Sequence, residues 1–273
     1  MSYASLMVHI DIDSELSGRV GIAADLADRF HSLVIGVSGW APMSVALADE
    51  AMLKTRPSVP DLERMKRMLD LKGNQFRTEA GKNGRQVDWR SDLDFPTEVL
   101  AREARAADLV IIGNKPENPD PFRALDPGGV LLKAGRPVLV VPPSVTALSP
   151  KRIAIAWKDV REARRAVRDA LPFLQQAENV TVVGISEEGA AHQAADLKDV
   201  ANYLARHRIT VVEEREQEAS GTVAESLLQL IHDEKFDSIV AGAYGHSRLG
   251  EWVFGGVTRQ LLAQSSVCCV FSH

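Results

Sequence analysis

The stretch that decides the fold runs from Gly242 to His273 and reads GAYGHSRLGEWVFGGVTRQLLAQSSVCCVFSH. It follows Ser238-Ile-Val-Ala241, a short β-branched run that is typical of a buried strand. Gly255-Gly256 precede the segment Val257–Leu262, whose apolar spacing predicts a helix. A strand, a glycine loop and a helix in this order let backbone N–H groups approach a ligand closely. They also direct the positive end of a helix at an anion.

The spacing of these glycines, Gly242-x2-Gly245-x9-Gly255, resembles the nucleotide-binding motif of the universal stress protein family. In that family the next residue is normally Ser or Thr, whereas this chain has Gly256. Thr258, two residues on, is the candidate to supply the missing hydroxyl. The resemblance implies a phosphate-binding loop, and the alternative is that the glycines serve only a tight strand-to-helix turn.

The composition is that of a soluble globular protein, with 273 residues of which 45% are hydrophobic and 25% charged. This length suits two domains, each large enough to bury a core. The net charge of −5, without a basic run, argues against a nucleic-acid-binding protein. The N-terminus lacks the pattern of a signal peptide, and no apolar stretch approaches the ~18 residues of a membrane span. We therefore expect a cytoplasmic protein without nucleic-acid or membrane partners.

The only cysteines, Cys268 and Cys269, are adjacent and so predict no framework of disulfides. We interpret them as small residues of a terminal strand rather than as a redox pair. The histidines His246 and His273 do not have the spacing of a metal site. The sequence therefore predicts no bound structural metal.

The chain contains an internal repeat, because Asp108-Leu-Val-Ile-Ile-Gly113 and Asp237-Ser-Ile-Val-Ala-Gly242 align 129 residues apart. Each half alternates strand-like and helix-like segments and has five strand candidates. We therefore predict an α/β fold of two tandem, doubly wound, five-stranded parallel-sheet domains of the Rossmann-like kind. The segment Ser144–Lys151, with Pro, Ser and Thr between two apolar strands, marks the boundary between domains 1–146 and 147–273.

The family resemblance adds expectations about topology. It implies an adenine nucleotide alpha hydrolase-like architecture with strand order 3-2-1-4-5 and two halves related by a pseudo-two-fold axis. In the family the last strands of two subunits pair with each other. Here we expect Val138–Val141 and Val267–Phe271 to pair antiparallel within one chain, which would make the chain an intrachain pseudo-dimer. Whether it also forms a homodimer stays open.

Three local expectations concern single segments. The extra residues of the first half, Ala41–Gln75, are expected to be at least half helical rather than to add strands, because prolines break the segment and helical charge spacing follows. We also expect a helix over Val160–Gln176 and a strand over Ile209–Glu213.

The predicted binding site lies where the carboxyl ends of the first and fourth strands of the second half meet, beside the crevice of an open α/β sheet. Lys158 stands where the family commonly has an Asp; it either favours an anionic ligand or is a solvated residue at a strand end. His246 could donate to a phosphate and Arg248 could pair with one, and the alternative is that both are surface residues. The complete set of predicted nucleotide-binding residues is Ala156, Trp157, Lys158, Asp159, Ile185, Gly242, Gly245, His246, Arg248, Gly255, Gly256, Val257 and Thr258.

The corresponding loop of the first half departs from the motif. It reads Gly113-Asn114-Lys115-Pro116, with a proline where the second glycine should stand. Proline fixes φ near −65° and removes an N–H donor. We therefore interpret the first half as a degenerate copy with a structural role.

The leading hypothesis is a tandem universal stress protein: a stress-responsive regulator that binds ATP or a related adenine nucleotide in its C-terminal half, with Mg²⁺ as an accompanying ion. A second hypothesis is a structural or protein-interaction module of the same fold that does not bind nucleotide. A third is a slow ATP hydrolase, although no catalytic residue is identified, since no general base or acidic Mg²⁺-ligand spacing is found. The sequence points to a small-molecule nucleotide and names no protein partner.

Overall fold

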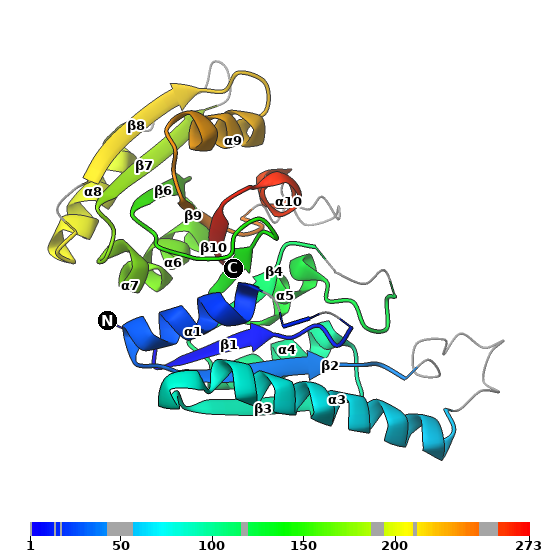
Figure 1. Ribbon diagram of the computed structural model, residues 1–273. Coiled ribbons are helices and arrows are strands. Elements are labelled where there is room, and N and C mark those ends of the chain that lie inside the picture. Colours follow the sequence, from blue (N-terminus) through cyan, green and yellow to red (C-terminus); the bar gives the residue numbers. More distant parts are fainter. Residues whose placement is uncertain are drawn as a thin grey trace. The chain divides into compact units, whose positions relative to one another are not determined.

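The computed structural model describes residues 2–13, 15–16, 18–42, 57–115, 120–186, 194–209, 212–245 and 256–273 (Figure 1). These residues form two compact units, Tyr3–Arg136 and Pro137–His273. Both units have parallel strands alternating with helices, which confirms the predicted α/β fold class.

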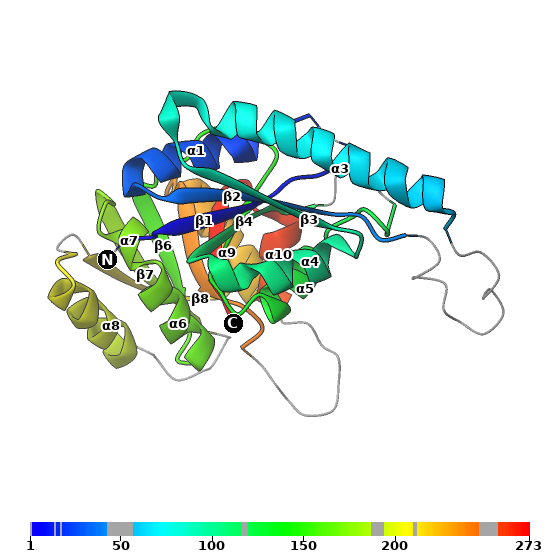
Figure 2. The same cartoon turned by 90° about the horizontal axis from the view of Figure 1, so that it is seen from below.

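The N-terminal unit has a parallel sheet in the order β3-β2-β1-β4. Helices α1 and α3 cover one face of this sheet, and α4 and α5 cover the other (Figure 2). Its elements are β1 (Ser5–His9), α1 (Gly18–Phe30), β2 (Leu33–Gly39), α3 (Val59–Ala80), β3 (Val87–Asp92), α4 (Pro96–Glu103), β4 (Leu109–Gly113) and α5 (Pro127–Lys133), with single 3-10 turns at Lys82–Gly84 and Ala104–Ala106.

The C-terminal unit has the strand order β5-β10-β9-β6-β7-β8. Without β5 this is the order 3-2-1-4-5 expected from the family resemblance. Helices α6 and α8 contact the sheet from one side, while α9 and α10 contact each other on the opposite side (Figure 1). Its elements are β5 (Val138–Val141), β6 (Arg152–Trp157), α6 (Arg161–Asp169), α7 (Leu171–Leu174), β7 (Asn179–Ser186), α8 (Ala194–Arg206), β8 (Val212–Glu218), α9 (Val223–Asp233), β9 (Ser238–Gly242), α10 (Gly256–Gln264) and β10 (Cys268–Ser272).

The two terminal strands pair as predicted. Strand β10 lies antiparallel to β5, with Cys269 opposite Val140 and Phe271 opposite Val138. On its other side β10 runs parallel to β9. Both strands are fully buried, so the apolar runs that would be exposed at a sheet edge are covered within one chain.

The sequence repeat has the same structural role in both units. Asp108 accepts hydrogen bonds through one carboxylate oxygen from the backbone N–H groups of Ala4 (2.7 Å) and Ser5 (3.0 Å). Asp237 does the same for Lys151 (2.8 Å) and Arg152 (3.0 Å). Each aspartate therefore fixes the start of the first strand against the start of the fourth.

Burial follows position in the sheet. Strand β4 (LVIIG) is buried at every residue, in a sheet whose two faces are covered by helices. Strand β8 (VEEREQE), at the end of the sheet order, is exposed or half-buried throughout. Its charged side chains make an apolar edge-to-edge contact unfavourable.

Three local expectations differ from the structure or are tested only in part. The helix expected over Val160–Gln176 is divided into α6 and α7 at Ala170, two residues before Pro172. The strand expected at Ile209–Glu213 is observed at Val212–Glu218, while residues 210–211 lie outside the described residues. Its C-terminal extension was missed because the mostly exposed acidic residues do not form an apolar run. In the extra segment of the first half, α3 is helical as expected and begins after the N-cap Ser58, whereas residues 43–56 lie outside the described residues.

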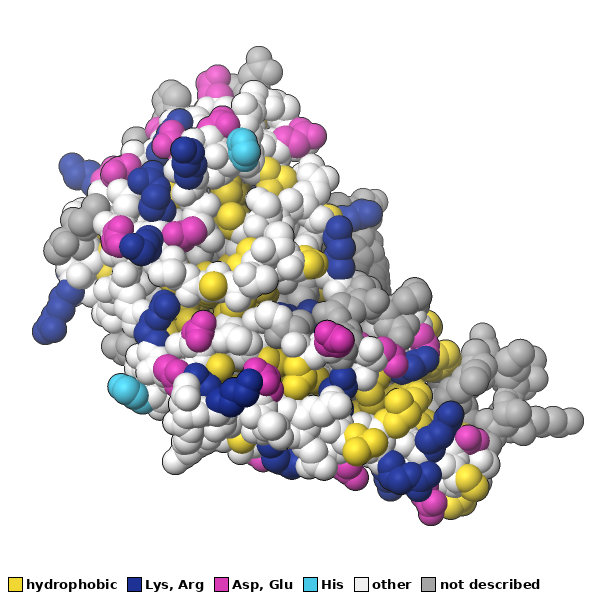
Figure 3. Space-filling model, viewed as in Figure 1, with side chains coloured by type: hydrophobic (Ala, Val, Ile, Leu, Met, Phe, Trp, Pro, Cys, Tyr) yellow, Lys and Arg dark blue, Asp and Glu magenta, His cyan; other side chains and the backbone are white. Residues whose placement is uncertain are grey.

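Positive and negative side chains are intermixed on the face shown in Figure 3. No helix among the described residues is long and apolar enough to cross a membrane.

Candidate functional site

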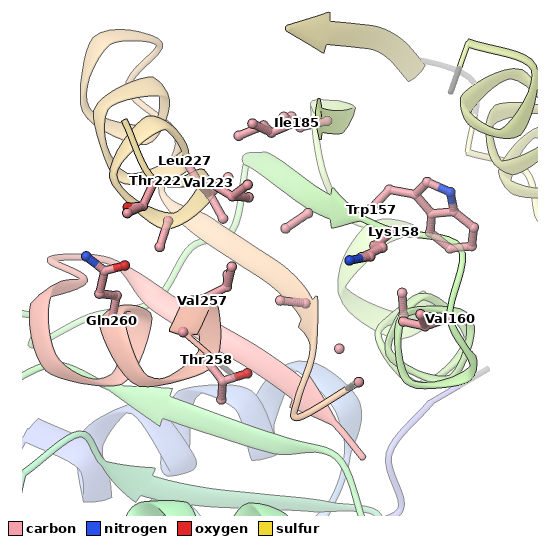
Figure 4. A pocket seen from close by; sticks show the side chains of 18 of the residues that line it. Trp157, Lys158, Val160, Ile185, Thr222, Val223, Leu227, Val257, Thr258 and Gln260 are labelled. Carbon is pink, nitrogen blue, oxygen red and sulfur yellow. The ribbon is translucent and has the colours of Figure 1, made fainter. Parts of the chain in front are cut away.

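A cavity of about 780 Å³ lies in the C-terminal unit. It opens at the carboxyl ends of β6, β7 and β9 and is bounded by the first turns of α6, α9 and α10 (Figure 4). The predicted site residues that line it are Ala156, Trp157, Lys158, Ile185, Gly242, Gly245, Gly256, Val257 and Thr258. The structure thus brings together segments separated by about 100 residues, as expected for the crevice of an open parallel sheet.

Four predicted site residues are not placed in the cavity lining. Asp159 instead accepts two hydrogen bonds from Arg164, at 2.6 and 3.0 Å, and both side chains are exposed. His246, Arg248 and Gly255 lie outside the described residues.

One wall of the cavity was missed by the sequence analysis. It is formed by the start of α9, where Gly221, Thr222, Val223 and Leu227 face the space. Thr222 and Glu225 form a capping box, in which each side chain accepts a hydrogen bond from the other residue's backbone N–H. The pattern Thr-x-x-Glu after the third strand was the sequence signal for this helix start. The other lining residues that were missed are Val160, Ala163, Val183, Ser186, Ala224, Ala241 and Gln260.

The glycine turn after β9 is shaped by close backbone contacts. A Cβ on Gly242 would lie 2.6 Å from the backbone nitrogen of Ala163, so only glycine lets β9 approach α6 this closely. A Cβ on Gly245 would lie 3.0 Å from a methyl carbon of Val160. The residue of this turn with a left-handed backbone is Tyr244, with φ of 56°, rather than one of the glycines.

Thr258 stabilises the same turn. Its buried hydroxyl oxygen accepts a hydrogen bond of 3.2 Å from the backbone N–H of Tyr244. Because a hydroxyl can donate while it accepts, Thr258 could still donate its proton to a ligand in the cavity. It lies in the first turn of α10, and that it supplies the hydroxyl absent at Gly256 stays a prediction.

The charge of the lining is one-sided. Lys158 extends its amine into the cavity, whereas the ring of Trp157 turns away from it (Figure 4). None of the described residues that line the cavity is Asp or Glu. Since the first turns of three helices also meet there, their partial positive charges add to that of the lysine.

A buried carboxylate lies behind the glycine turn. Glu162, in the first turn of α6, is almost fully buried and is hydrogen-bonded to Arg161. Burial alone would raise its pKa, but the hydrogen bonds from Arg161 and from its own backbone N–H outweigh this effect and hold the pKa below the usual value. Glu162 is therefore ionised at neutral pH.

The two cysteines are buried and free of disulfides. Burial raises the pKa of both Cys268 and Cys269 to about 12, so they remain neutral thiols. Within the described ranges no group of three or more His, Cys, Asp or Glu side chains could hold a metal ion.

Charged side chains lie at the equivalent positions of the N-terminal unit. The guanidinium of the buried Arg19, in the first turn of α1, lies where a Cβ of Gly113 would be. Beside it is His9, whose pKa is lowered to about 3 by burial and by the charge of Arg19. At the start of α5, the carboxylate of Asp126 accepts a hydrogen bond of 3.0 Å from the N–H of Gly128. Residues 116–119, with the predicted proline interruption, lie outside the described part of the chain.

A loop of the N-terminal unit also covers the ends of its strands. Arg123 pairs with Asp13 after β1 and with Asp120, both at 2.8 Å. Its guanidinium also lies 4.9 Å from the ring centre of Trp40, which follows β2. These contacts hold the segment after β4 against the carboxyl ends of the first two strands.

Solved structures of other proteins share the fold of this chain. A universal stress protein from Archaeoglobus fulgidus DSM 4304 is 13% identical over 98% of this chain and 95% of its own, with a TM-score of 0.73. A functionally unknown protein from Pseudomonas aeruginosa PAO1 is 15% identical over 98% of this chain and 92% of its own, with a TM-score of 0.57. These likenesses show the fold along the whole chain. No curated protein matches the sequence.

The family assignment comes from the sequence of the C-terminal half. Residues 150–271 match the Universal stress protein family. This range contains the residues that line the cavity, including the glycine turn and the first turns of α6, α9 and α10. The chain therefore carries a universal stress protein domain at residues 150–271.

Proposed function

We propose that the cavity of the C-terminal unit binds ATP or a related adenine nucleotide, and that the protein is a stress-responsive regulator rather than an enzyme. The observation that carries this proposal is the meeting of three helix N-termini and Lys158 around a space whose described lining has no carboxylate. Such a lining attracts an anion and leaves backbone N–H groups available to phosphate oxygens.

Size and polarity support a nucleotide. A volume of about 780 Å³ is within the usual range for small-molecule sites. The glycine turn and the first turn of α10 form the polar end, which suits phosphates. Ile185, Val223 and Leu227 form an apolar part, which suits a base. Each favourable charge at a helix N-terminus contributes about 0.3–1 kcal/mol, and each hydrogen bond to a charged oxygen contributes about 1.5–3 kcal/mol.

A regulatory role agrees with the chemistry of the lining. Hydrolysis of ATP requires a group that activates or orients water, usually a carboxylate or imidazole near the terminal phosphate. The described lining residues include neither type. Release of phosphate from ATP above the rate in buffer, proportional to protein concentration, would contradict this part of the proposal.

Binding is tested by filling the cavity without disturbing the fold. Apart from its chain neighbours and the backbone of α10, no described atom lies within 4 Å of a Cβ placed on Gly256, so Gly256→Leu adds a side chain at the cavity wall. Gly21→Leu is the matched control, because Gly21 lies on α1 of the other unit and is equally open. In titrations with a fluorescent ATP analogue, Gly256→Leu should weaken binding at least about ten-fold, the equivalent of one lost hydrogen bond to a charged oxygen.

A second variant addresses the glycine turn itself. Gly245→Val would force its side chain against Val160 and Glu162 and should displace the turn, with a similar loss of affinity. Native mass spectrometry of freshly purified wild type should find retained nucleotide. If neither wild type nor Gly21→Leu binds the analogue, or if Gly256→Leu binds it as tightly as wild type, the interaction-module hypothesis replaces nucleotide binding at this site.

A further inference from the structure

The peptide bond between Ala243 and Tyr244, in the glycine turn, is held at both ends by side chains. Its N–H donates to the hydroxyl oxygen of Thr258 at 3.2 Å, and its carbonyl oxygen lies 3.0 Å from Nδ1 of His273. Because a carbonyl oxygen only accepts, Nδ1 of His273 carries the proton in this contact. One peptide is thus bound to α10 at one end and to the residue that follows β10 at the other.

His273 is itself anchored to α6. Its backbone oxygen accepts a hydrogen bond of 2.7 Å from Arg165 of this helix. The hydroxyl of Ser272, the residue before it, donates to Asp169 of the same helix at 2.8 Å. The ring of His273 also meets the ring of Tyr244 edge-on, with 6.3 Å between the ring centres. The histidine therefore has a defined position from which it can hold the turn.

The conformation held by these contacts is a disfavoured one. Tyr244 has a φ of 56°, in the left-handed region that residues with a Cβ rarely adopt. Reversal of the peptide before Tyr244 would take its φ out of this region. Such a backbone conformation persists only where the surrounding structure fixes it. The hydrogen bonds to Thr258 and His273 oppose this reversal, because it would break both of them.

The orientation of this peptide decides which of its ends points toward the cavity. The N–H and C=O groups of a trans peptide point in opposite directions. In the structure the N–H points to Thr258, which lines the cavity, and the oxygen points to His273. In the reversed orientation the carbonyl oxygen would point toward Thr258 and the first turn of α10. Its partial negative charge would then repel a phosphate bound there.

Resting on the proposed function, we propose that His273 is a positioning residue of the nucleotide site, which holds the peptide between Ala243 and Tyr244 in the orientation that an anion requires. It acts through the turn and not by contact with the nucleotide. Only molecules with this orientation bind phosphate well. The apparent dissociation constant therefore rises as the fraction of such molecules falls.

The first test compares two substitutions of similar shape. His273→Asn places an amide N–H where Nδ1 is, whereas His273→Leu places a methyl group there, and both lose the ring contact with Tyr244. His273→Leu should weaken binding of a fluorescent ATP analogue by about three- to ten-fold, within the range for one hydrogen bond, and His273→Asn should stay within about two-fold of wild type. The control is His232→Leu, because His232 is an exposed histidine in the last turn of α9. Urea unfolding of each variant establishes that it is folded.

The second test removes the backbone strain instead of the hydrogen bond. Glycine adopts the left-handed region about as readily as the right-handed one. Tyr244→Gly combined with His273→Leu should therefore bind the ATP analogue more tightly than His273→Leu alone, although it has fewer contacts. In wild type, nitrogen NMR of the neutral His273 ring should show the proton on Nδ1. A proton on Nε2 alone would overturn the inference.

The outcomes of these titrations separate the inference from the proposed function. If wild type binds ATP and the Leu and Asn variants of His273 have equal affinities, the inference is overturned while nucleotide binding stands. The inference is also overturned if adding Tyr244→Gly to His273→Leu brings no gain in affinity. Absence of ATP binding by wild type overturns the proposed function and this inference with it. Weaker binding by His273→Leu that is restored in His273→Asn supports both.

Discussion

The crevices at the carboxyl ends of the first and fourth strands differ between the two units. In the C-terminal unit the crevice is a cavity lined by glycines, a lysine and helix N-termini. In the N-terminal unit Arg19 fills the space against Gly113, and Asp126 caps the start of α5. A cation and a carboxylate from the protein itself thus lie at the first turns of α1 and α5 in the N-terminal unit. The difference teaches that a repeated fold keeps its crevice, and that a few side chains decide whether it is open to a ligand.

Matching positions in the two units make the comparison specific. Arg19 and Glu162 are each the second residue of the first helix of their unit, and both are buried. His9 and Ala156 also have equivalent positions. Val8, before His9, pairs with Ile111 of β4, and Ile155, before Ala156, pairs with Val240 of β9, the residue that aligns with Ile111 in the sequence repeat. Acid and substitutions should therefore affect the two units differently.

The largest effect is expected from acid acting on His9. Burial and the charge of Arg19 lower its folded-state pKa to about 3 from 6.5, so below the unfolded pKa only the unfolded chain binds the proton. Above the unfolded-state pKa of His9 the N-terminal unit keeps its full free energy of unfolding. As pH falls from this pKa toward the folded-state pKa, that free energy decreases by about 1.4 kcal/mol per pH unit. Urea unfolding with amide exchange should show the N-terminal unit losing stability faster than the C-terminal unit, where Ala156 stands.

The control for this effect is His9→Gln, which removes the titrating group. Its N-terminal unit should lose stability more slowly with falling pH than wild type over the same interval. Identical slopes for wild type and His9→Gln would show that His9 is not the group responsible.

The next effect compares one glycine in both copies. Gly242→Ala places a Cβ against backbone atoms of Ala163 and Glu162, which cannot move without shifting α6. We expect a loss at the upper end of the range of about 1–3 kcal/mol for overpacking. The atom nearest to the added Cβ of Gly113→Ala is the end of the Arg19 side chain, which can shift more easily than backbone, so this variant should cost clearly less. Chemical denaturation of each variant measures the difference, and equal costs would contradict this account.

A smaller effect concerns the turn beside the cavity. Thr258→Val keeps the shape of the side chain but removes the acceptor of the Tyr244 N–H. A part-buried donor without a partner costs about 1–3 kcal/mol, and partial access to water should keep this loss near the lower end. Thr258→Ser keeps the hydroxyl and should stay close to wild type in thermal unfolding. A stable Thr258→Val with unchanged ATP affinity would show that this hydroxyl has no role.

The smallest effect is expected at the cap of α5. Asp126→Ala removes the carboxylate that accepts from Gly128, and loss of an N-cap costs about 1 kcal/mol. Asp126→Asn keeps an oxygen acceptor and should recover most of the loss. Because Arg19 still lies against Gly113 when the cap is removed, ATP titration of Asp126→Ala should still give one binding site per chain. A second site would mean that Asp126 alone closes the N-terminal crevice.

The fold could be predicted well because its signals are local or repeated. The apolar runs of β4 and β9 and the shared Asp108 and Asp237 mark corresponding elements in both halves. Strand β8 was misplaced because an edge strand needs no apolar run, and its acidic residues resemble a solvated loop or helix.

The candidate site was predicted where motif and strand ends coincide. Glycine spacing identified the turn from Gly242 to Gly245, and strand ends identified Lys158. The wall from α9 was missed because Thr222 and Leu227 are brought in by the direction of a helix, which periodicity does not give. Arg19 was missed because an arginine in a first helical turn is usually solvated, and its burial depends on the crevice it fills.

The pairing of β5 with β10 has a consequence for biosynthesis. During translation β5 leaves the ribosome about 130 residues ahead of its partner, which at about 5–20 residues per second is a delay of roughly 7–26 s. During this delay the apolar edge of β5 that later faces β10 has no strand beside it and is a site for chaperone binding or aggregation. A fragment beginning at residue 147 would lack β5 and leave β10 with an open edge, whereas one beginning at Pro137 would keep the pair.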